Sequence, residues 1–284
     1  LQFNVVRIYN MDEDFYSNLR DPYLINSYRN HFDFGGGGML YFTTNSATNP
    51  KDTYFYLRLQ TDFAGNMLSL FNSGLKKDEK GSYLIWGVPY SQYVRSEISL
   101  VETLRFGQQK RLALAGRFLA GLGYAYGNSN VLPFEKFFYA GGSNSMRGWQ
   151  SRSVGPGSAP MDSTFAIANQ TGDMRLEANL EFRFPLFWKL QGGLFIDVGN
   201  VWNLQRASLD GVTRDERGIF KTENFGKSIA ANWGIGLRLD FDMLLIRLDA
   251  GIKAYDPVTQ QWHTPNMWFR KNGYAIHFGI GYPF

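Results

Sequence analysis

Two arginines stand close together in a glycine-rich segment, residues 137–160, which reads FFYAGGSNSMRGWQSRSVGPGSAP. Arg147 or Arg152 could bind an acidic partner, because a planar guanidinium holds carboxylates through forked hydrogen bonds. Acidic candidates follow in two nearby segments, at Glu181 and Asp197. Whether these groups can meet depends on the elements that position them.

The segments that carry the two acids alternate between large apolar residues and polar or small ones, as half-buried strands do. Glu181 lies on the polar face of DMRLEANLEFRF, and Asp197 lies on the polar face of KLQGGLFIDVGNVW. The two segments are joined across PLF, so they form a predicted hairpin whose acids face the same side. The C-terminal segment YAIHFGIGYPF alternates most strictly and is expected to place on one face Tyr274, Ile276, Phe278, Ile280, Tyr282 and Phe284.

Charged residues recur on the polar face of nearly every such segment, and aromatic residues gather near the segment ends. A soluble sandwich would turn these polar faces to water, whereas the aromatic girdles favour lipid outside and a wet, charged lumen inside. We therefore predict an all-β fold, a transmembrane antiparallel β-barrel with about ten strands in this chain, forming one outer-membrane domain over residues 1–284. The strands are expected at 2–9, 31–44, 53–63, 90–106, 109–127, 172–184, 188–202, 230–241, 244–255 and 273–284.

The expected connections alternate in length. Short ones fall near 45–52, 107–108, 185–187 and 242–243, and long ones at about 10–30, 64–89, 128–171, 203–229 and 256–272. Short turns on one side and long loops on the other are typical of outer-membrane barrels, and the C-terminus lies on the short-turn side, which is periplasmic. The glycine-rich segment then belongs to the longest extracellular loop, about 128–171.

That loop is long enough to fold into the lumen. Two acids on one wall need a cation, and Arg147 is the natural candidate to bridge Glu181 and Asp197. The alternative is that the lumenal charges satisfy each other across strands while the loop stays solvated.

The run LPFEKFFYAGGSNSMRGW, followed by NLEFRFPL, FIDVGNVW and HFGIGYPF, resembles the C-terminal barrel of outer-membrane assembly factors of the BamA/TamA type. The segment FAGNMLSLF and its flanking loops look most like TamA-like members from Bacteroidetes-type bacteria. The most specific part is the run from Gly141 and Gly142 to Arg147, Gly148 and Trp149. The resemblance implies that the last three residues form an inward-folded tip whose arginine contacts Glu181 and Asp197.

Family barrels have sixteen strands and follow periplasmic POTRA repeats, whereas this chain has about ten predicted strands and no such repeats. Five predicted strands follow the long loop, as the family requires, so the missing part is expected at the front. The resemblance thus implies a C-terminal portion of a sixteen-stranded barrel in a bacterial outer membrane. The implied partners are outer-membrane lipids including lipopolysaccharide, client outer-membrane proteins, and accessory lipoproteins or a periplasmic factor.

The resemblance implies a protein-folding machine in which the last strand, 273–284, opens at a weak seam and templates client strands. Gly279 and Gly281 would weaken that strand, and the terminal Phe284 resembles a signal by which barrel proteins are recognised. Relief of crowding inside the barrel explains the two glycines equally well. A passive or secretion pore of the same superfamily, with the loop as a plug, is the alternative function.

Other classes of function have little support in the sequence. The histidines, His31, His263 and His277, come with no evident nucleophile arrangement, so no enzyme is predicted. There is no cysteine, metal-ligand cluster, phosphate loop or dinucleotide motif, so neither a metal nor a cofactor is expected. Basic residues are scattered at a net charge of +4, which argues against nucleic acid as a partner.

Overall fold

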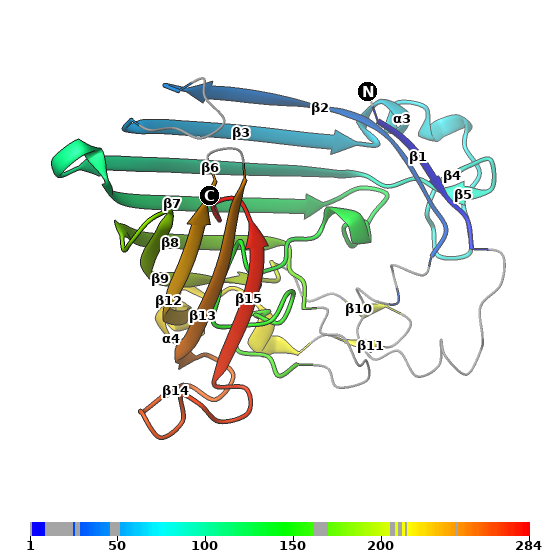
Figure 1. The fold of residues 1–284 in the computed structure, drawn as a ribbon. Helices are drawn as coiled ribbons and strands as arrows, with labels where there is room; N and C mark the ends of the chain where they lie inside the picture. Colours follow the sequence, from blue (N-terminus) through cyan, green and yellow to red (C-terminus); the bar gives the residue numbers. More distant parts are fainter. Residues whose placement is uncertain are drawn as a thin grey trace.

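A computed structural model describes residues 2–8, 25, 29–45, 52–161, 170–204, 208–209, 212–213, 215–241 and 244–284. Within them the chain forms one eleven-stranded antiparallel sheet, shown in Figure 1 as a strongly curved open surface. Its strands are β1 (Gln2–Val6), β2 (His31–Thr43), β3 (Tyr54–Ala64), β6 (Tyr93–Phe106), β7 (Leu112–Ala125), β8 (Met174–Pro185), β9 (Leu190–Trp202), β12 (Ala230–Asp240), β13 (Leu245–Asp256), β14 (Gln261–Trp262) and β15 (Tyr274–Ile280). The all-β prediction and its ten strands are confirmed, because β14 is only a two-residue addition at the end of β13.

The remaining elements are short and lie in the connections. Two-residue strands pair as β4 (Leu84–Ile85) with β5 (Val88–Pro89) and as β10 (Ser208–Leu209) with β11 (Val212–Thr213). The helical turns are α3 (Asn66–Ser69), α4 (Phe225–Ser228), η1 (Asn72–Gly74), η2 (Gln108–Lys110), η3 (Phe134–Lys136), η4 (Glu216–Gly218) and η5 (Thr222–Asn224). No helix among the described residues is long and apolar enough to cross a membrane.

Strands follow one another around the sheet in chain order, and β13 pairs with both β12 and β15. In the described part of the chain β1 and β15 do not pair with each other, so each leaves one edge of the sheet open. The connection from β7 to β8 enters the concave side of this sheet (Figure 1).

The two faces of the sheet differ in chemistry. The convex face exposes large apolar side chains in alternate positions, among them Leu180, Ile196, Ile235, Leu248, Ile276 and Phe278, which are 47%, 55%, 56%, 48%, 58% and 67% exposed. The concave face carries charged residues that are buried, among them Glu181, Asp197, Arg238 and Asp249, which are all 0% exposed. So much exposed apolar surface requires lipid around it, which places the charged face toward a lumen.

Boundary differences have local causes. The predicted strand 109–127 begins only at Leu112, because Gly107 turns the chain with φ +78° and η2 follows it, whereas the predicted strand 90–106 ends at Phe106 as expected and begins at Tyr93. The predicted turn at 242–243 lies outside the described residues.

The prediction for the C-terminal end is wrong in one respect. The last strand ends at Ile280 instead of reaching Phe284, because Gly281 takes a left-handed conformation with φ +81°. Beyond this turn, the ring centroid of Tyr282 lies 4.0 Å from the guanidinium carbon of Arg183. The ring centroid of Phe284 lies 5.2 Å from the guanidinium carbon of Arg117. Both aromatic side chains therefore lie on the charged side of the sheet and not on the lipid-facing side.

Because the convex face is expected to meet lipid, Ile235→Arg in the middle of β12 should destabilise the protein by about 2–4 kcal/mol in a bilayer. The matched control is Val258→Arg in the connection from β13 to β14, where a similarly exposed side chain lies beyond the strand ends. Urea unfolding in lipid vesicles measures both. Equal stability of the two variants would contradict the assignment of the lipid-facing side.

Candidate functional site

The connection between β7 and β8 folds back through a few backbone contacts. Phe138 forms a bridge with Gly172, and Ala140 forms a bridge with Val154, so the two arms of the loop run antiparallel. Between them, Gly141 and Gly142 have φ of +102° and +100°, a region that favours glycine. The amide of Gly142 then donates to the carbonyl of Trp149 at 3.1 Å, which closes a compact tip over residues 142–149.

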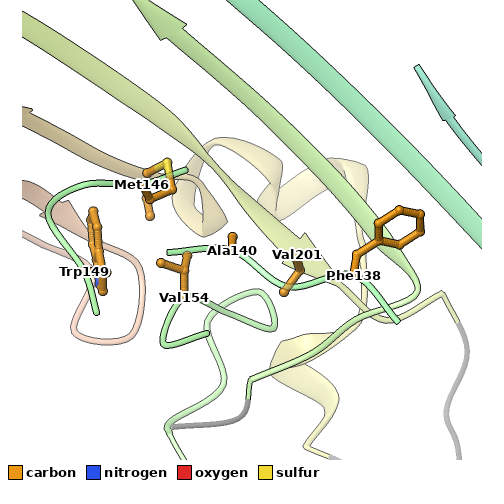
Figure 2. Close-up of a cluster of buried hydrophobic side chains, with 7 residues drawn as sticks. Phe138, Ala140, Met146, Trp149, Val154 and Val201 are labelled. Carbon is orange, nitrogen blue, oxygen red and sulfur yellow. The ribbon is translucent and has the colours of Figure 1, made fainter. Parts of the chain in front are cut away.

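A buried apolar cluster fixes this tip to the sheet. Met146 and Trp149 of the tip belong to one buried cluster with Val201 of β9 and Ala230 of β12. Figure 2 shows Met146 and Trp149 at one end of the cluster, with Val201 and Phe138 at the other. Burying these side chains supplies a non-directional attraction, while the polar groups of the tip set its position.

Arg147 is fully buried between the two acids that the sequence analysis singled out. Its Nη2 lies 2.8 Å from Asp197 Oδ1, and its Nε and backbone N–H donate to Asp197 Oδ2 at 3.0 and 3.1 Å. Its Nη1 donates to Glu181 Oε2. The structure thus brings together all three charged residues of the predicted contact, and their part in function stays a prediction.

Neighbouring protein groups take the place of water around the Arg147 guanidinium and its partner Asp197. The ring of Phe195 lies 3.6 Å from the guanidinium carbon, and amides of Asn179 and Asn232 each donate to Asp197 at 2.9 Å. Burial alone would lower the pKa of the Arg147 guanidinium, but the attraction of Asp197 and Glu181 raises it above its usual range. Arg147 therefore keeps its charge.

The wall carries cations of its own, which the sequence analysis did not assign. Glu181 also pairs with Arg183 Nε at 2.8 Å and with Arg238 Nη2 at 3.0 Å. The premise that both acids wait for the loop arginine is therefore wrong for Glu181. Among the described residues, Arg147 is the cation that pairs with Asp197. Strand alternation had placed Arg183 and Arg238 on the same inner face, and this signal could have identified them.

Another arginine of the wall, Arg247, binds the tip directly. Arg247 Nη1 donates to the carbonyl of Ser143 at 2.9 Å, and its Nη2 donates to Asn144 Oδ1. Arg247 also pairs with Asp249 at 3.1 Å, and Asp249 pairs with Arg238 at 2.7 Å. The tip therefore joins a charge network that extends from β8 to β13.

Glycines let the tip approach the wall closely. A Cβ on Gly148 would lie 2.6 Å from Cβ of Asn232, and a Cβ on Gly251 of β13 would lie 2.2 Å from the Arg147 carbonyl oxygen. Trp149 lies beside these contacts, with Lys253 Nζ 5.0 Å from its ring centroid. The sequence analysis had identified Gly148 and Trp149 but not Gly251.

Arg152 and the terminal glycines have separate environments. The guanidinium carbon of Arg152 lies 4.4 Å from the ring centroid of Tyr139, and Arg152 forms no ion pair with another of the described residues. A Cβ on Gly279 would lie 2.6 Å from Arg247 Nε, which supports relief of crowding as its role, whereas Gly281 makes the turn after β15.

We expect Gly148→Ala to displace the tip, because the added methyl group would overlap Asn232 and could not be relieved without moving the loop or β12. The loop should become susceptible to protease while the barrel stays folded, as judged by heat-dependent gel mobility. Gly226→Ala is the matched control, since a Cβ there meets nothing within 4 Å. Equal protease resistance of the two variants would show that the close approach of the tip is not required.

Comparison with known proteins shows the family to which this chain belongs. The crystal structure of BamA from Haemophilus ducreyi lacking POTRA domains 1–3 is similar with a TM-score of 0.46 and 15% identity, over 88% of this chain and 53% of that one. CdiB from Acinetobacter baumannii is similar with a TM-score of 0.35 and 12% identity, over 88% of this chain and 42% of that one. This chain thus spans about half the length of these structures or less. The model of the Omp85 superfamily domain matches residues 2–284, so the chain belongs to the Omp85 superfamily, whose members are assembly and transport factors of the outer membrane.

Proposed function

We propose that this chain is the barrel portion of an outer-membrane assembly factor that folds client β-barrels or autotransporters through the edge of β15. The proposal rests on β15, the last strand in chain order, which pairs with β13 on one side and turns its other edge to the position that the first strand of a complete barrel would occupy. An open edge offers unpaired N–H and C=O groups that can template an incoming strand. The C-terminal, periplasmic side of β15 is then the side from which a client strand arrives.

The length of β15 supports the same proposal. This strand has 7 residues, whereas its neighbour β13 has 12 and a spanning strand needs about 9–11. A short apolar band beside the open edge would thin the bilayer locally and lower the cost of inserting a client. Lipids, including lipopolysaccharide, and accessory lipoproteins or a periplasmic factor are the proposed partners of this edge besides the client.

We propose that the buried tip occupies the lumen and keeps the edge strand β15 in its place beside the wall. Arg147 fixes the tip to β8 and β9, and the tip also contacts the strands near the open edge. His277 on β15 lies near the backbone of Arg147 and Trp149, although its Nε2 makes no hydrogen bond of ordinary geometry. Loss of Arg147 is therefore expected to disturb β15 as well as the loop.

We expect Arg147→Ala to leave the barrel inserted while the loop opens and client assembly declines. The reason is that Asp197 would stay buried without its cation, which costs about 3–5 kcal/mol. Adding Asp197→Asn to Arg147→Ala should restore part of the protease resistance, because it removes the buried, unpaired charge of the Asp197 carboxylate. Adding Glu181→Gln should not, since Glu181 keeps Arg183 and Arg238 as partners.

Arg152→Ala is the matched control for loss of a loop arginine and should behave as the unsubstituted protein. Limited proteolysis of the loop and the yield of folded client in proteoliposomes are the two measurements. Normal protease resistance of Arg147→Ala would refute the role assigned to the buried arginine.

The open edge can be tested by cross-linking, because the chain has no cysteine of its own. A cysteine at Ile276 on β15 should form a disulfide with a cysteine on the terminal strand of a stalled client. A cysteine at Leu180 on β8 should not, although both side chains are exposed on the convex face. Equal cross-linking at both positions would indicate contact without strand templating.

A secretion pore with the loop as plug is the second candidate, and the buried tip fits both functions. Single-channel conductance in planar bilayers separates them. A large, steady conductance that is unchanged in Arg147→Ala would favour the pore and contradict assembly through the edge of β15.

A further inference from the structure

A second cluster of charged side chains lies at the other end of the long loop. His31 and Asp33 lie on the concave face at the start of β2, and Glu135 of η3 lies next to both of them. One ligand atom from each residue lies within 4.8 Å of those of the other two, and His31 Nε2 is 3.5 Å from Glu135 Oε1. The sequence analysis found no such cluster, because Glu135 is far from the other two residues along the chain.

Neighbouring contacts keep Glu135 in this place. Asn4 on β1, which pairs with Asp33, donates to Glu135 Oε1 at 3.3 Å. Lys136 Nζ lies 2.9 Å from Gln2 Oε1 and 3.7 Å from an oxygen of Asp62 on β3. The cluster is therefore built from strand residues and a loop turn that is fixed on both sides.

Three buried polar atoms of the cluster make no hydrogen bond of ordinary geometry, although Ser91 lies near the Asp33 carboxylate. Asp33 is 0% exposed, and neither of its carboxylate oxygens receives a hydrogen bond of ordinary geometry. Nε2 of His31 is buried and equally without a hydrogen-bond partner. An ionised buried carboxylate is costly unless it is paired or coordinates a metal, so Asp33 in its ionised form needs a cation beside it.

The orientation of His31 favours a metal ion as that cation. Its Nδ1 lies 3.1 Å from the carbonyl oxygen of Arg29, which can only accept, so Nδ1 carries the hydrogen. In the neutral ring, the lone pair of Nε2 then points toward the carboxylates, as in metal sites whose histidine is oriented by a backbone carbonyl. Ligand atoms bound at about 2.0–2.2 Å around a tetrahedral zinc ion lie roughly 3.4 Å apart, close to the observed separation of His31 and Glu135.

We propose that His31, Asp33 and Glu135 bind a divalent transition-metal ion, with Zn²⁺ as the best fit. One imidazole and two carboxylates suit zinc, whereas Ca²⁺ and Mg²⁺ prefer oxygen ligands alone. The side chain of Glu135 is 37% exposed, which gives the ion a path from solvent and leaves room for a water as fourth ligand. A bound ion would join β2 to the loop at a point separate from the buried tip, and this site does not depend on the proposed assembly function.

The test is calorimetric titration of the intact, chelator-treated protein in detergent with zinc chloride, and in parallel with calcium chloride. We expect one Zn²⁺ per chain, no comparable Ca²⁺ binding, and a Zn²⁺ affinity that falls at least about 10–100-fold in Asp33→Asn and in Glu135→Gln. Zn²⁺ should also slow proteolysis of the loop in the unsubstituted protein but not in these variants. His263→Gln, which removes a histidine from another loop, is the matched control and should bind Zn²⁺ unchanged.

The competing explanation is a protonated His31 that pairs with Glu135 without any metal. Absence of saturable Zn²⁺ binding by the unsubstituted protein, or unchanged binding in Glu135→Gln, would overturn the metal-site proposal and favour the protonated His31. Glu135→Gln decides the question even where the buried Asp33→Asn fails to fold, because Glu135 is partly exposed in a loop turn.

Discussion

A guanidinium that leaves water loses several kcal/mol of hydration unless protein acceptors replace the water around it. Arg147 is completely buried, and Glu181 and Asp197 supply those acceptors from two adjacent strands. Because Asp197 has no other cation among its described partners, the arginine and the aspartate are stable in this place only together. Moving the tip away from the wall would therefore leave the buried charge of Asp197 unpaired.

The sheet is built to accept this charge. Strand alternation turns apolar side chains to lipid and leaves the concave face polar, so Arg183, Arg238 and Asp249 form a charge network with Glu181 on the wall itself. The backbone of the tip can come close to β13 only where the strand has no side chain, and Gly251 leaves this room for the carbonyl of Arg147. The same wall could not serve a soluble sandwich, whose inner faces must be apolar.

Period-two alternation predicted the strands and the inward direction of Glu181 and Asp197, because side-chain direction in a strand is fixed by parity alone. The prediction from alternation failed at Phe284, because the left-handed conformation of Gly281 ends the strand and side chains beyond it no longer alternate between the two faces. It also could not find Glu135 beside His31, because contacts between a loop and a distant strand leave no periodic signal. The charges of the wall were visible in the sequence, but which acid each arginine binds depends on sheet register.

The loop contacts both ends of the sheet, and the two sets of contacts differ in strength. Near its start, Val131 and Leu132 pack with Tyr93 of β6, and the ion pairs of Lys136 and Glu135 there are partly exposed. At its tip the ion pairs are fully buried, so separating them costs more than separating the exposed ones. If the sheet widens at the edge of β15, the two ends of the loop are pulled apart, and the electrostatic contacts near Glu135 should separate first. A metal ion at that end would oppose this separation and bring the two attachments closer in strength.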